Sequence, residues 1–274
     1  MQSSPGADIT TAMIRVCVSA AAAAFFTISA AMAQQSTPQD PAEILGTVDP
    51  EQRRVTEAIV RNYILRNPEI VLEAIRTLQS REQAVEDDRA IHAVAANHRA
   101  LRHDPATPVG GNPNGDVTIV EFFDYACPYC RNAHSVLAPL IKDDPNIRIA
   151  YKELPVLGEA SVFAARVGIS VHLLAPDRYL DFHAAMFQAR GRLSRDIAIQ
   201  TAVELGVNRV RLMEAIESDE VGQLINRNQQ LAQTIGVNGT PGFLIGDAIV
   251  PGLIRIDQFK QLIAQAREYC ASCQ

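Results

Sequence analysis

Glu121-Phe122-Phe123-Asp124-Tyr125-Ala126-Cys127-Pro128-Tyr129-Cys130 is the segment that predicts most about the fold. A short apolar run leads into two cysteines separated by two residues, and the pattern over residues 131–140 predicts a helix. A strand thus delivers a CxxC motif to a helix N-terminus, where unpaired backbone N–H groups and the helix dipole stabilise a thiolate. We expect Cys127 to be the reactive thiol and Cys130, one turn further along, to be the more buried one.

The composition describes an acidic chain with material for a thioredoxin-sized core and about one further unit. Its 274 residues are 47% hydrophobic and carry a formal net charge of -6, and the sequence contains no basic run. Such a charge distribution argues against nucleic acid and against anionic lipid as partners.

Residues 13–33 resemble a secretory leader. Arg15 supplies a basic n-region, an apolar segment follows, and an A-x-A cleavage site ends at Ala33. The apolar segment has about 15 residues, fewer than the roughly 20 that span a bilayer, which favours a cleaved leader over a membrane anchor. We therefore assign residues 1–33 to a signal peptide, cleaved near Ala33, and expect a periplasmic protein.

Residues 34–103 are expected to form a linker followed by a helical arm. The linker, residues 34–50, is rich in Gln, Pro, Ser and Asp. Beyond it, an apolar stripe at helical spacing is interrupted at Asn67-Pro68 and then resumes, and a charged helical tail follows. Nothing local covers this stripe, so it either folds back onto the next domain or binds the same stripe of other copies. We expect the second arrangement, a homo-oligomer formed through the residue 50–100 arm.

The remaining residues, 104–274, are expected to form one α/β domain. Strands are predicted over residues 117–123 and 146–154, on either side of the CxxC helix. About four helical patterns then occupy residues 160–237, and the last of them is a single helix over residues 210–235. A predicted hairpin and a last helix complete the domain. This order predicts a thioredoxin fold with an inserted helical domain.

The chemistry of a CxxC depends on its surroundings, because redox catalysis, zinc ligation and a static disulfide all use this motif. Thr240 and Pro241 directly precede the hairpin, where a thioredoxin-type site places a cis proline that leaves an edge free for the substrate backbone. Glu121 is a carboxylate within an apolar run and a candidate proton acceptor for Cys130. Lys152, at the end of the next strand, could pair with Glu121, either in a buried proton relay or in a surface salt bridge.

Taken together, these motifs resemble the DsbA-like thiol:disulfide oxidoreductases, and within them the ScsC-type proteins that carry an N-terminal helical arm. The likeness covers about residues 50–268. It rests on residues 120–130, on Lys152-Glu153-Leu154-Pro155 and on Gly239-Thr240-Pro241-Gly242-Phe243.

The resemblance implies a role for each matching position. Cys127 corresponds to the nucleophilic cysteine, Cys130 to the resolving cysteine and Pro241 to the cis proline, while Glu121 and Lys152 correspond to a buried pair. The resemblance implies neither a cofactor nor a metal ion.

The supporting positions Pro128, Tyr129 and Thr240 include two departures from the pattern of strongly oxidising members. Those proteins usually carry histidine where Tyr129 stands between the cysteines. Thr240 before the proline resembles the isomerase and ScsC-like pattern. The sequence therefore leaves the direction of the reaction open.

The implied function is disulfide formation or isomerisation in unfolded or misoxidised exported proteins, with electrons passed to a membrane redox partner. Three alternatives remain: a glutaredoxin, which shares Cys-Pro-Tyr-Cys but is small and cytosolic; a copper-tolerance protein that binds or relays Cu(I) through the same cysteines; and a structural oligomer with an inert disulfide. Cys270 and Cys273 form a second CxxC that either staples the end of the last helix or acts as an auxiliary redox pair.

Overall fold

The computed structural model describes residues 49–272, with side chains described up to Glu268. The predicted signal peptide, nearly all of the linker and the side chains of Cys270 and Cys273 lie outside this range. Two compact units divide the chain between Ile70 and Val71. Among the described residues, no helix combines the length and apolar character that a bilayer crossing requires.

The described part of the first unit consists of α2 (Pro50–Arg66) and the first residues of α3 (Glu69–Ala96). The Asp49 side chain caps α2 by accepting hydrogen bonds from two backbone N–H groups of its first turn. The helix ends before Pro68, as its interruption of the apolar pattern predicts.

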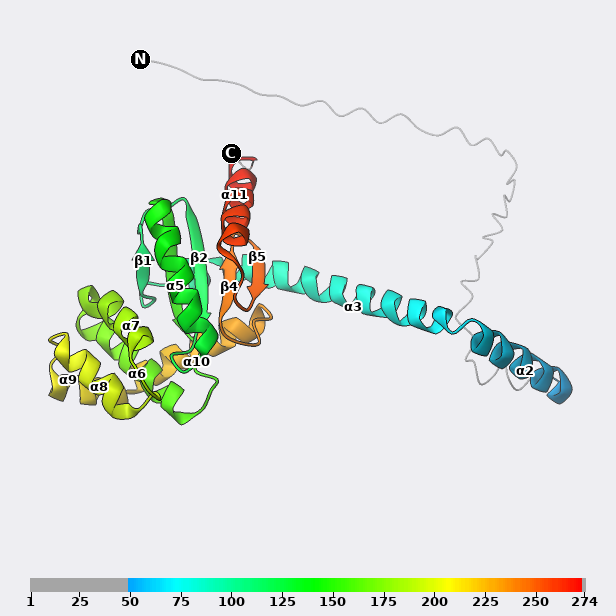
Figure 1. The fold of residues 1–274 in the computed structure, drawn as a ribbon, viewed down its shortest axis with the longest axis horizontal. Helices are drawn as coiled ribbons and strands as arrows, with labels where there is room; N and C mark the ends of the chain where they lie inside the picture. Colours follow the sequence, from blue (N-terminus) through cyan, green and yellow to red (C-terminus); the bar gives the residue numbers. More distant parts are fainter. Residues whose placement is uncertain (1–48, 273–274) are drawn as a thin grey trace, which may run out of the picture. The chain divides into compact units, whose positions relative to one another are not determined.

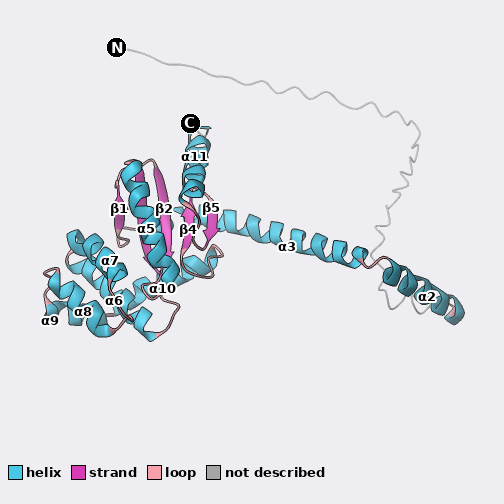
Figure 2. Ribbon diagram, viewed as in Figure 1, coloured by secondary structure: helices cyan, strands magenta, loops and turns pink. Residues whose placement is uncertain are grey.

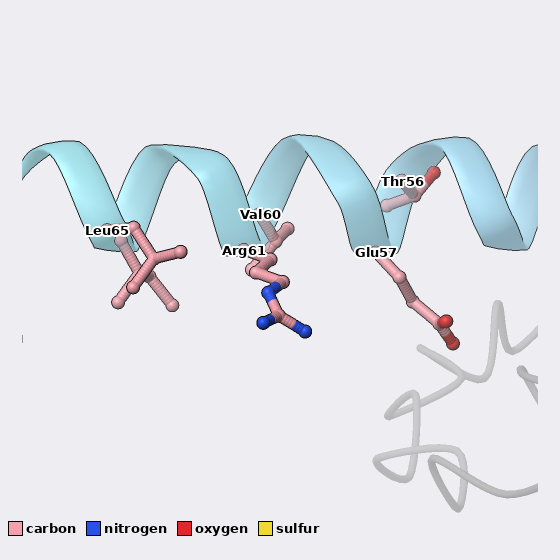
Figure 3. Close-up of a pocket in the computed structure, with 6 residues that line it drawn as sticks. Thr56, Glu57, Val60, Arg61 and Leu65 are labelled. Carbon is pink, nitrogen blue, oxygen red and sulfur yellow. The ribbon is translucent and has the colours of Figure 1, made fainter.

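None of the α2 side chains is buried. Apolar side chains stand in solvent along the helix, and Figure 3 shows two of them, Val60 and Leu65, beside Thr56, Glu57 and Arg61. The predicted apolar stripe is therefore present on α2, and its side chains are exposed to solvent.

The second unit is built on a five-stranded sheet in the order β1-β3-β2-β4-β5 (Figures 1 and 2). Strands β2 and β3 are parallel, and the other neighbouring pairs are antiparallel. The bounds are β1 (Val109–Gly111), β2 (Val117–Phe123), β3 (Ile147–Glu153), β4 (Gly242–Ile245) and β5 (Ala248–Pro251). β1 is an additional strand within a segment rich in proline and glycine, where turn residues hide its pattern.

Helices pack on both faces of this sheet. On one face, α5 (Pro128–Asp143) and α11 (Ile256–Ser272) bury apolar residues such as Leu137 and Phe259, and the Phe259 ring contacts Phe243 of β4. On the other face, the last turns of α3, α4 (His98–Arg102) and α10 (Asp219–Thr234) bury Val94, Leu101 and Leu231. The predicted α/β fold is thus confirmed as a thioredoxin-like arrangement of three layers.

A helical insert separates β3 from β4. It consists of α6 (Glu159–Leu174), the short helix η1 (Pro176–Arg178), α7 (Tyr179–Gln188), α8 (Arg195–Glu204), α9 (Arg209–Glu217) and α10. The predicted single helix over residues 210–235 is wrong, because it is two helices, α9 and α10. Ser218 separates them: its backbone is extended, and its side chain accepts a hydrogen bond from Val221 N.

Candidate functional site

The CxxC motif lies where β2 meets α5. Cys127 is the N-cap residue of α5, Pro128 occupies the first turn, and Cys130 follows inside the helix. Both thiols are free and buried, and Cys130 is the more buried of the two, as expected. Tyr129 points outward and is 65% exposed.

The loop before β4 faces the first cysteine. The Cys127 thiol donates a hydrogen bond to the carbonyl oxygen of Thr240 at 3.3 Å. The Thr240–Pro241 peptide bond is cis, and Pro241 leads directly into β4, which pairs antiparallel with β2. The structure therefore brings together the four residues Cys127, Cys130, Thr240 and Pro241 that the sequence singled out.

Glu121 lies beneath this site with no hydrogen-bond partner on either carboxylate oxygen among the described residues. Its side chain is 1% exposed, and this burial raises its pKa from an ordinary 4.5 to about 8. Burial also raises the pKa of the Cys130 thiol well above its usual range, with smaller contributions from Cys127 and Glu121. Glu121 and Cys130 thus influence each other electrostatically in the same buried region.

Lys152 does not join Glu121. Neighbouring residues of a strand point to opposite faces of the sheet, and β2 and β3 are paired with Glu121 opposite Tyr151 and Phe122 opposite Lys152. Tyr151 belongs to the core on the α5 side, whereas Phe122 belongs to the core on the α10 side. Glu121 and Lys152 are therefore on different faces, which excludes both the buried pair and the surface salt bridge between them.

Lys152 instead donates a hydrogen bond to Thr107 Oγ1 at 2.8 Å, with its side chain fully buried. Burial lowers the pKa of its ammonium from 10.5 to about 8, against opposing contributions from Asp104 and Glu153. Lys152 thus joins β3 to the segment that precedes β1 and lies away from the CxxC side of the sheet.

A second buried carboxylate shares the face of Glu121. Glu153 accepts a hydrogen bond from the Tyr179 hydroxyl at 2.9 Å, and burial raises its pKa to about 7. Close by, the Tyr125 hydroxyl lies 3.3 Å from His183 Nδ1, within a cluster of aromatic rings. Strand alternation could have placed Glu153 with Glu121, but no sequence signal marks its partner Tyr179 on α7, because this residue comes from the distant insert.

Comparisons with known proteins agree with this geometry. Residues 118–264 match the family model described as the DSBA-like thioredoxin domain, and residues 52–84 match the Copper resistance protein ScsC N-terminal domain. Disulfide bond formation protein D of Bacillus subtilis is 24% identical over 169 residues, which cover 57% of this chain and 75% of that protein.

Solved structures give the same result. A thioredoxin-like oxidoreductase from Silicibacter pomeroyi is 41% identical, with a TM-score of 0.60, and the match covers 63% of this chain and 98% of that one. ScsC of Proteus mirabilis in a transitional conformation is 28% identical, with a TM-score of 0.61, over 81% of this chain and 100% of that one. The second match extends beyond the thioredoxin domain toward the N-terminus.

Proposed function

Since the chain belongs to the DsbA-like thioredoxin family and catalyses thiol–disulfide exchange, we propose that its substrates are unfolded or misoxidised exported proteins. The observation that carries the proposal is the placement of Cys127 at the start of α5, with Cys130 beside it and the Thr240 carbonyl in front of it. A sulfur that faces a backbone carbonyl at a helix N-terminus can react with a cysteine in an extended chain.

In the oxidising direction, a substrate thiolate attacks Cys127 Sγ of the Cys127–Cys130 disulfide. The sulfur–sulfur bond breaks, and Cys130 leaves as a thiolate that takes up the proton held by Glu121. A second substrate thiolate then attacks the substrate sulfur of the mixed disulfide and releases Cys127. The substrate loses two electrons and gains a disulfide, and the CxxC is reduced until a membrane redox partner reoxidises it.

In the isomerising direction, the reduced Cys127 thiolate attacks an incorrect substrate disulfide, and Cys130 provides release if the mixed disulfide persists. We propose that the site supports both directions. Tyr129 favours isomerisation because strongly oxidising relatives usually carry histidine at its position between the cysteines. Thr240 favours it because a threonine before the proline resembles the isomerase and ScsC-like pattern. Pro128 starts the helix and leaves Cys127 at its cap.

The arm supports a homo-oligomer. Its apolar side chains are exposed on α2, and the match to the ScsC N-terminal domain covers residues 52–84. Several copies joined through the arm would present several CxxC sites to one misoxidised substrate, which suits isomerisation. We propose residues 34–103 as linker and arm, with the end of the arm, at Val94 and Leu101, packed on the sheet, and residues 104–274 as the catalytic domain with its insert.

Export is proposed from the leader. Cleavage near Ala33 would release the protein into the periplasm, where disulfides persist. Sequencing the N-terminus of the protein recovered from cells tests this assignment, and an intact N-terminus would contradict it.

A second candidate function is Cu(I) binding, favoured by the name of the matched N-terminal domain. Cys127 and Cys130 would supply two soft thiolate ligands. Titration of the reduced protein with Cu(I), with Cys127→Ala as the control, distinguishes this function from disulfide exchange: a copper protein loses stoichiometric binding in the variant.

The proposed function is tested with two substrates, a reduced protein and a scrambled one. We expect activity on at least the scrambled substrate, loss of both activities in Cys127→Ser, and mixed disulfides that accumulate in Cys130→Ser. The matched control is the Cys270→Ser/Cys273→Ser protein, which keeps its activity if the second CxxC is a staple and loses part of it if that pair is redox-active. A Cys130→Ser protein that accumulates no mixed disulfide would contradict the mechanism.

A further inference from the structure

The end of α7 packs against the first turns of the CxxC helix. α7 lies beside α5 (Figure 1), and the ring centres of Phe187 and His134 are 5.5 Å apart. About one turn nearer the cysteines, Arg131 Nη1 donates a hydrogen bond to the carbonyl oxygen of Ala189 at 3.0 Å. The loop over residues 189–194, between α7 and α8, is therefore held against the start of α5.

This loop lies close to the reactive cysteine. The backbone N–H of Arg131 donates to Cys127 O at 3.2 Å, so the two residues are one helical turn apart, and a turn advances the helix by about 5.4 Å. A protein that docks over a reactive thiol covers an area of several hundred Å² around it, on the order of 800 Å² in a stable complex. A partner that reaches Cys127 therefore also covers the α7–α8 loop.

The loop and the start of α8 add three arginines to Arg131. Four exposed residues form this arginine cluster: Arg131, Arg190, Arg192 and Arg195. Arg195 is the first residue of α8, and its guanidinium carbon lies 4.5 Å from the centre of the Phe163 ring on α6. This cation–π contact keeps the fourth charge on the same side of the insert as the loop.

The protein does not neutralise the arginine cluster. Within residues 49–268, none of the ion pairs includes one of its four members. Residues 188–196 contain three arginines and one acidic residue, Asp196, whereas the whole chain has a net charge of -6. Neighbouring like charges repel each other, and a cation at the start of a helix, where Arg195 stands, is disfavoured by the helix dipole. The cluster is thus a positive patch on an acidic protein, in an arrangement that does not favour the fold.

We propose that the arginine cluster is the docking surface for a redox partner protein whose reactive cysteine is flanked by carboxylates. This inference rests on the proposed function, in which every catalytic cycle includes one exchange with such a partner. It adds the chemistry by which the partner is recognised.

A fixed charge suits a redox partner better than it suits the substrates. Substrates differ in charge from one protein to the next, so a positive patch would attract some and repel others. A partner that the enzyme meets in every cycle can carry the complementary charge. Charged groups at the edge of an interface mainly raise the rate of association, and redox encounters are brief and use small interfaces. Carboxylates beside the partner's cysteine would face the arginines while its sulfur reaches Cys127.

The first test measures disulfide exchange between the full-length oxidised protein and three peptides at an ionic strength of about 10 mM, where the Debye length is about 30 Å. The peptides carry one cysteine flanked by aspartates, by asparagines or by lysines. A peptide thiolate attacks Cys127 Sγ, Cys130 leaves as a thiolate, and a second peptide thiolate releases the peptide disulfide. Each variant is compared with the wild type on the same peptide, so that differences in the pKa of the peptide thiols cancel.

We expect Arg190→Gln/Arg192→Gln to lower the rate with the aspartate peptide about tenfold and to change the rate with the asparagine peptide by less than about twofold. The matched control is Arg209→Gln/Arg211→Gln, which removes two exposed arginines from α9. It should leave all three rates within about twofold of the wild type.

The second test reverses the charge. We expect Arg190→Glu/Arg192→Glu to react about tenfold faster than the wild type with the lysine peptide and more slowly with the aspartate peptide. Both effects should fall below about twofold in 1 M salt, where the Debye length is about 3 Å. A variant that is merely misfolded would slow all three peptides at both salt concentrations.

The outcomes separate the inference from the proposed function. If the wild-type protein reacts with none of the peptides, the proposed function fails. If it reacts, but Arg190→Gln/Arg192→Gln leaves the rate with the aspartate peptide unchanged, only the docking surface is overturned.

Two further measurements test the choice of partner. We expect Arg190→Gln/Arg192→Gln to isomerise a scrambled protein of near-zero net charge within about twofold of the wild-type rate, and a larger fall would assign the cluster to substrates and overturn the proposal. Co-sedimentation of the wild type with phosphatidylglycerol vesicles, together with equal effects of the variant on all three peptides, would assign the cluster to a membrane surface and overturn it as well.

Discussion

Apolar side chains are usually buried and charged side chains usually exposed, and two regions of this protein depart from this rule. The helical arm departs from it with exposed apolar side chains, and the centre of the thioredoxin domain with buried charged ones. The arm exposes apolar side chains along α2 and along residues 71–91 of α3, whereas the domain buries Glu121, Lys152 and Glu153 around its central strands. Apolar surface is stabilised when another surface covers it, whereas a buried charged group is stabilised by hydrogen bonds or by losing its charge. The exposed apolar side chains of the arm therefore need a partner surface, whereas the buried charged groups are stabilised within the domain.

The first prediction concerns the exposed apolar side chains of the arm. If they need no partner surface, the contrast between the arm and the domain is lost. We expect Ile59→Asp to dissociate the homo-oligomer at concentrations at which the wild-type protein remains associated, a shift of about 100-fold, because a charge placed in an apolar contact is costly. Sedimentation velocity over a dilution series measures the shift. The matched control is Ala58→Asp, which adds the same charge about 100° around α2 from Ile59, outside the apolar stripe. A wild-type protein that sediments as a monomer throughout would contradict the expectation.

The second prediction concerns the buried Glu121. The folded protein holds the proton of Glu121 up to a pH of about 8, whereas the unfolded chain loses it near 4.5, so this group lowers the free energy of unfolding as the pH rises between those values. We expect Glu121→Gln to gain stability relative to the wild type by on the order of 4 kcal/mol between pH 4.5 and pH 8.5.

Urea unfolding of the reduced proteins at the two pH values measures this difference. Glu214→Gln, which removes an exposed carboxyl on α9, is the matched control. A constant difference between Glu121→Gln and the wild type across this pH range would show that the carboxyl is ionised in the folded state.

The third prediction concerns the position along α3 at which its side chains begin to pack on the domain. Val94 is fully buried against the sheet, whereas Val85 is 50% exposed. We expect Val94→Ala to lower the free energy of unfolding of the domain by about 2 kcal/mol, and Val85→Ala to change it by less than about 0.5 kcal/mol. Urea unfolding at a protein concentration low enough to avoid association measures both changes. Equal effects of the two substitutions would contradict the expectation that only the part of α3 with Val94 packs on the domain.

The smallest expected effect separates Glu121 from Lys152. Because the two side chains are on opposite faces of the sheet, a double-mutant cycle of Glu121→Gln and Lys152→Met should give an interaction free energy below about 0.5 kcal/mol. A buried pair would give several times more. Unfolding of the four proteins at pH 7 measures the cycle, and a large interaction would restore the pair that the sequence suggested.

Much of the fold follows from local pattern. The apolar run into the CxxC predicts β2 and its helix, and the interruption at Asn67-Pro68 predicts the end of α2. These features depend on neighbouring residues alone. The extra strand β1 and the division at Ser218 were missed, because a three-residue strand and a single capping serine are weaker than the pattern around them.

The candidate site also has some features that local spacing predicts and others that depend on tertiary contacts. Spacing alone identified Cys127 and Cys130, and position before the hairpin identified Pro241. The pairing of Glu121 with Lys152 was inferred from proximity in the strand order, but strand register places consecutive residues on opposite faces. Glu153 and its partner Tyr179 were missed because an insert brings them together.

Residue type and short spacing were enough to predict a CxxC at the start of a helix, most of the order of the elements and the exposed stripe of the arm. Only the tertiary structure decided which charged groups share the space beneath Cys130, which loop faces Cys127 and which arginines gather beside it. Those relations join residues from different strands and from the insert, and they depend on the register and packing of the whole sheet.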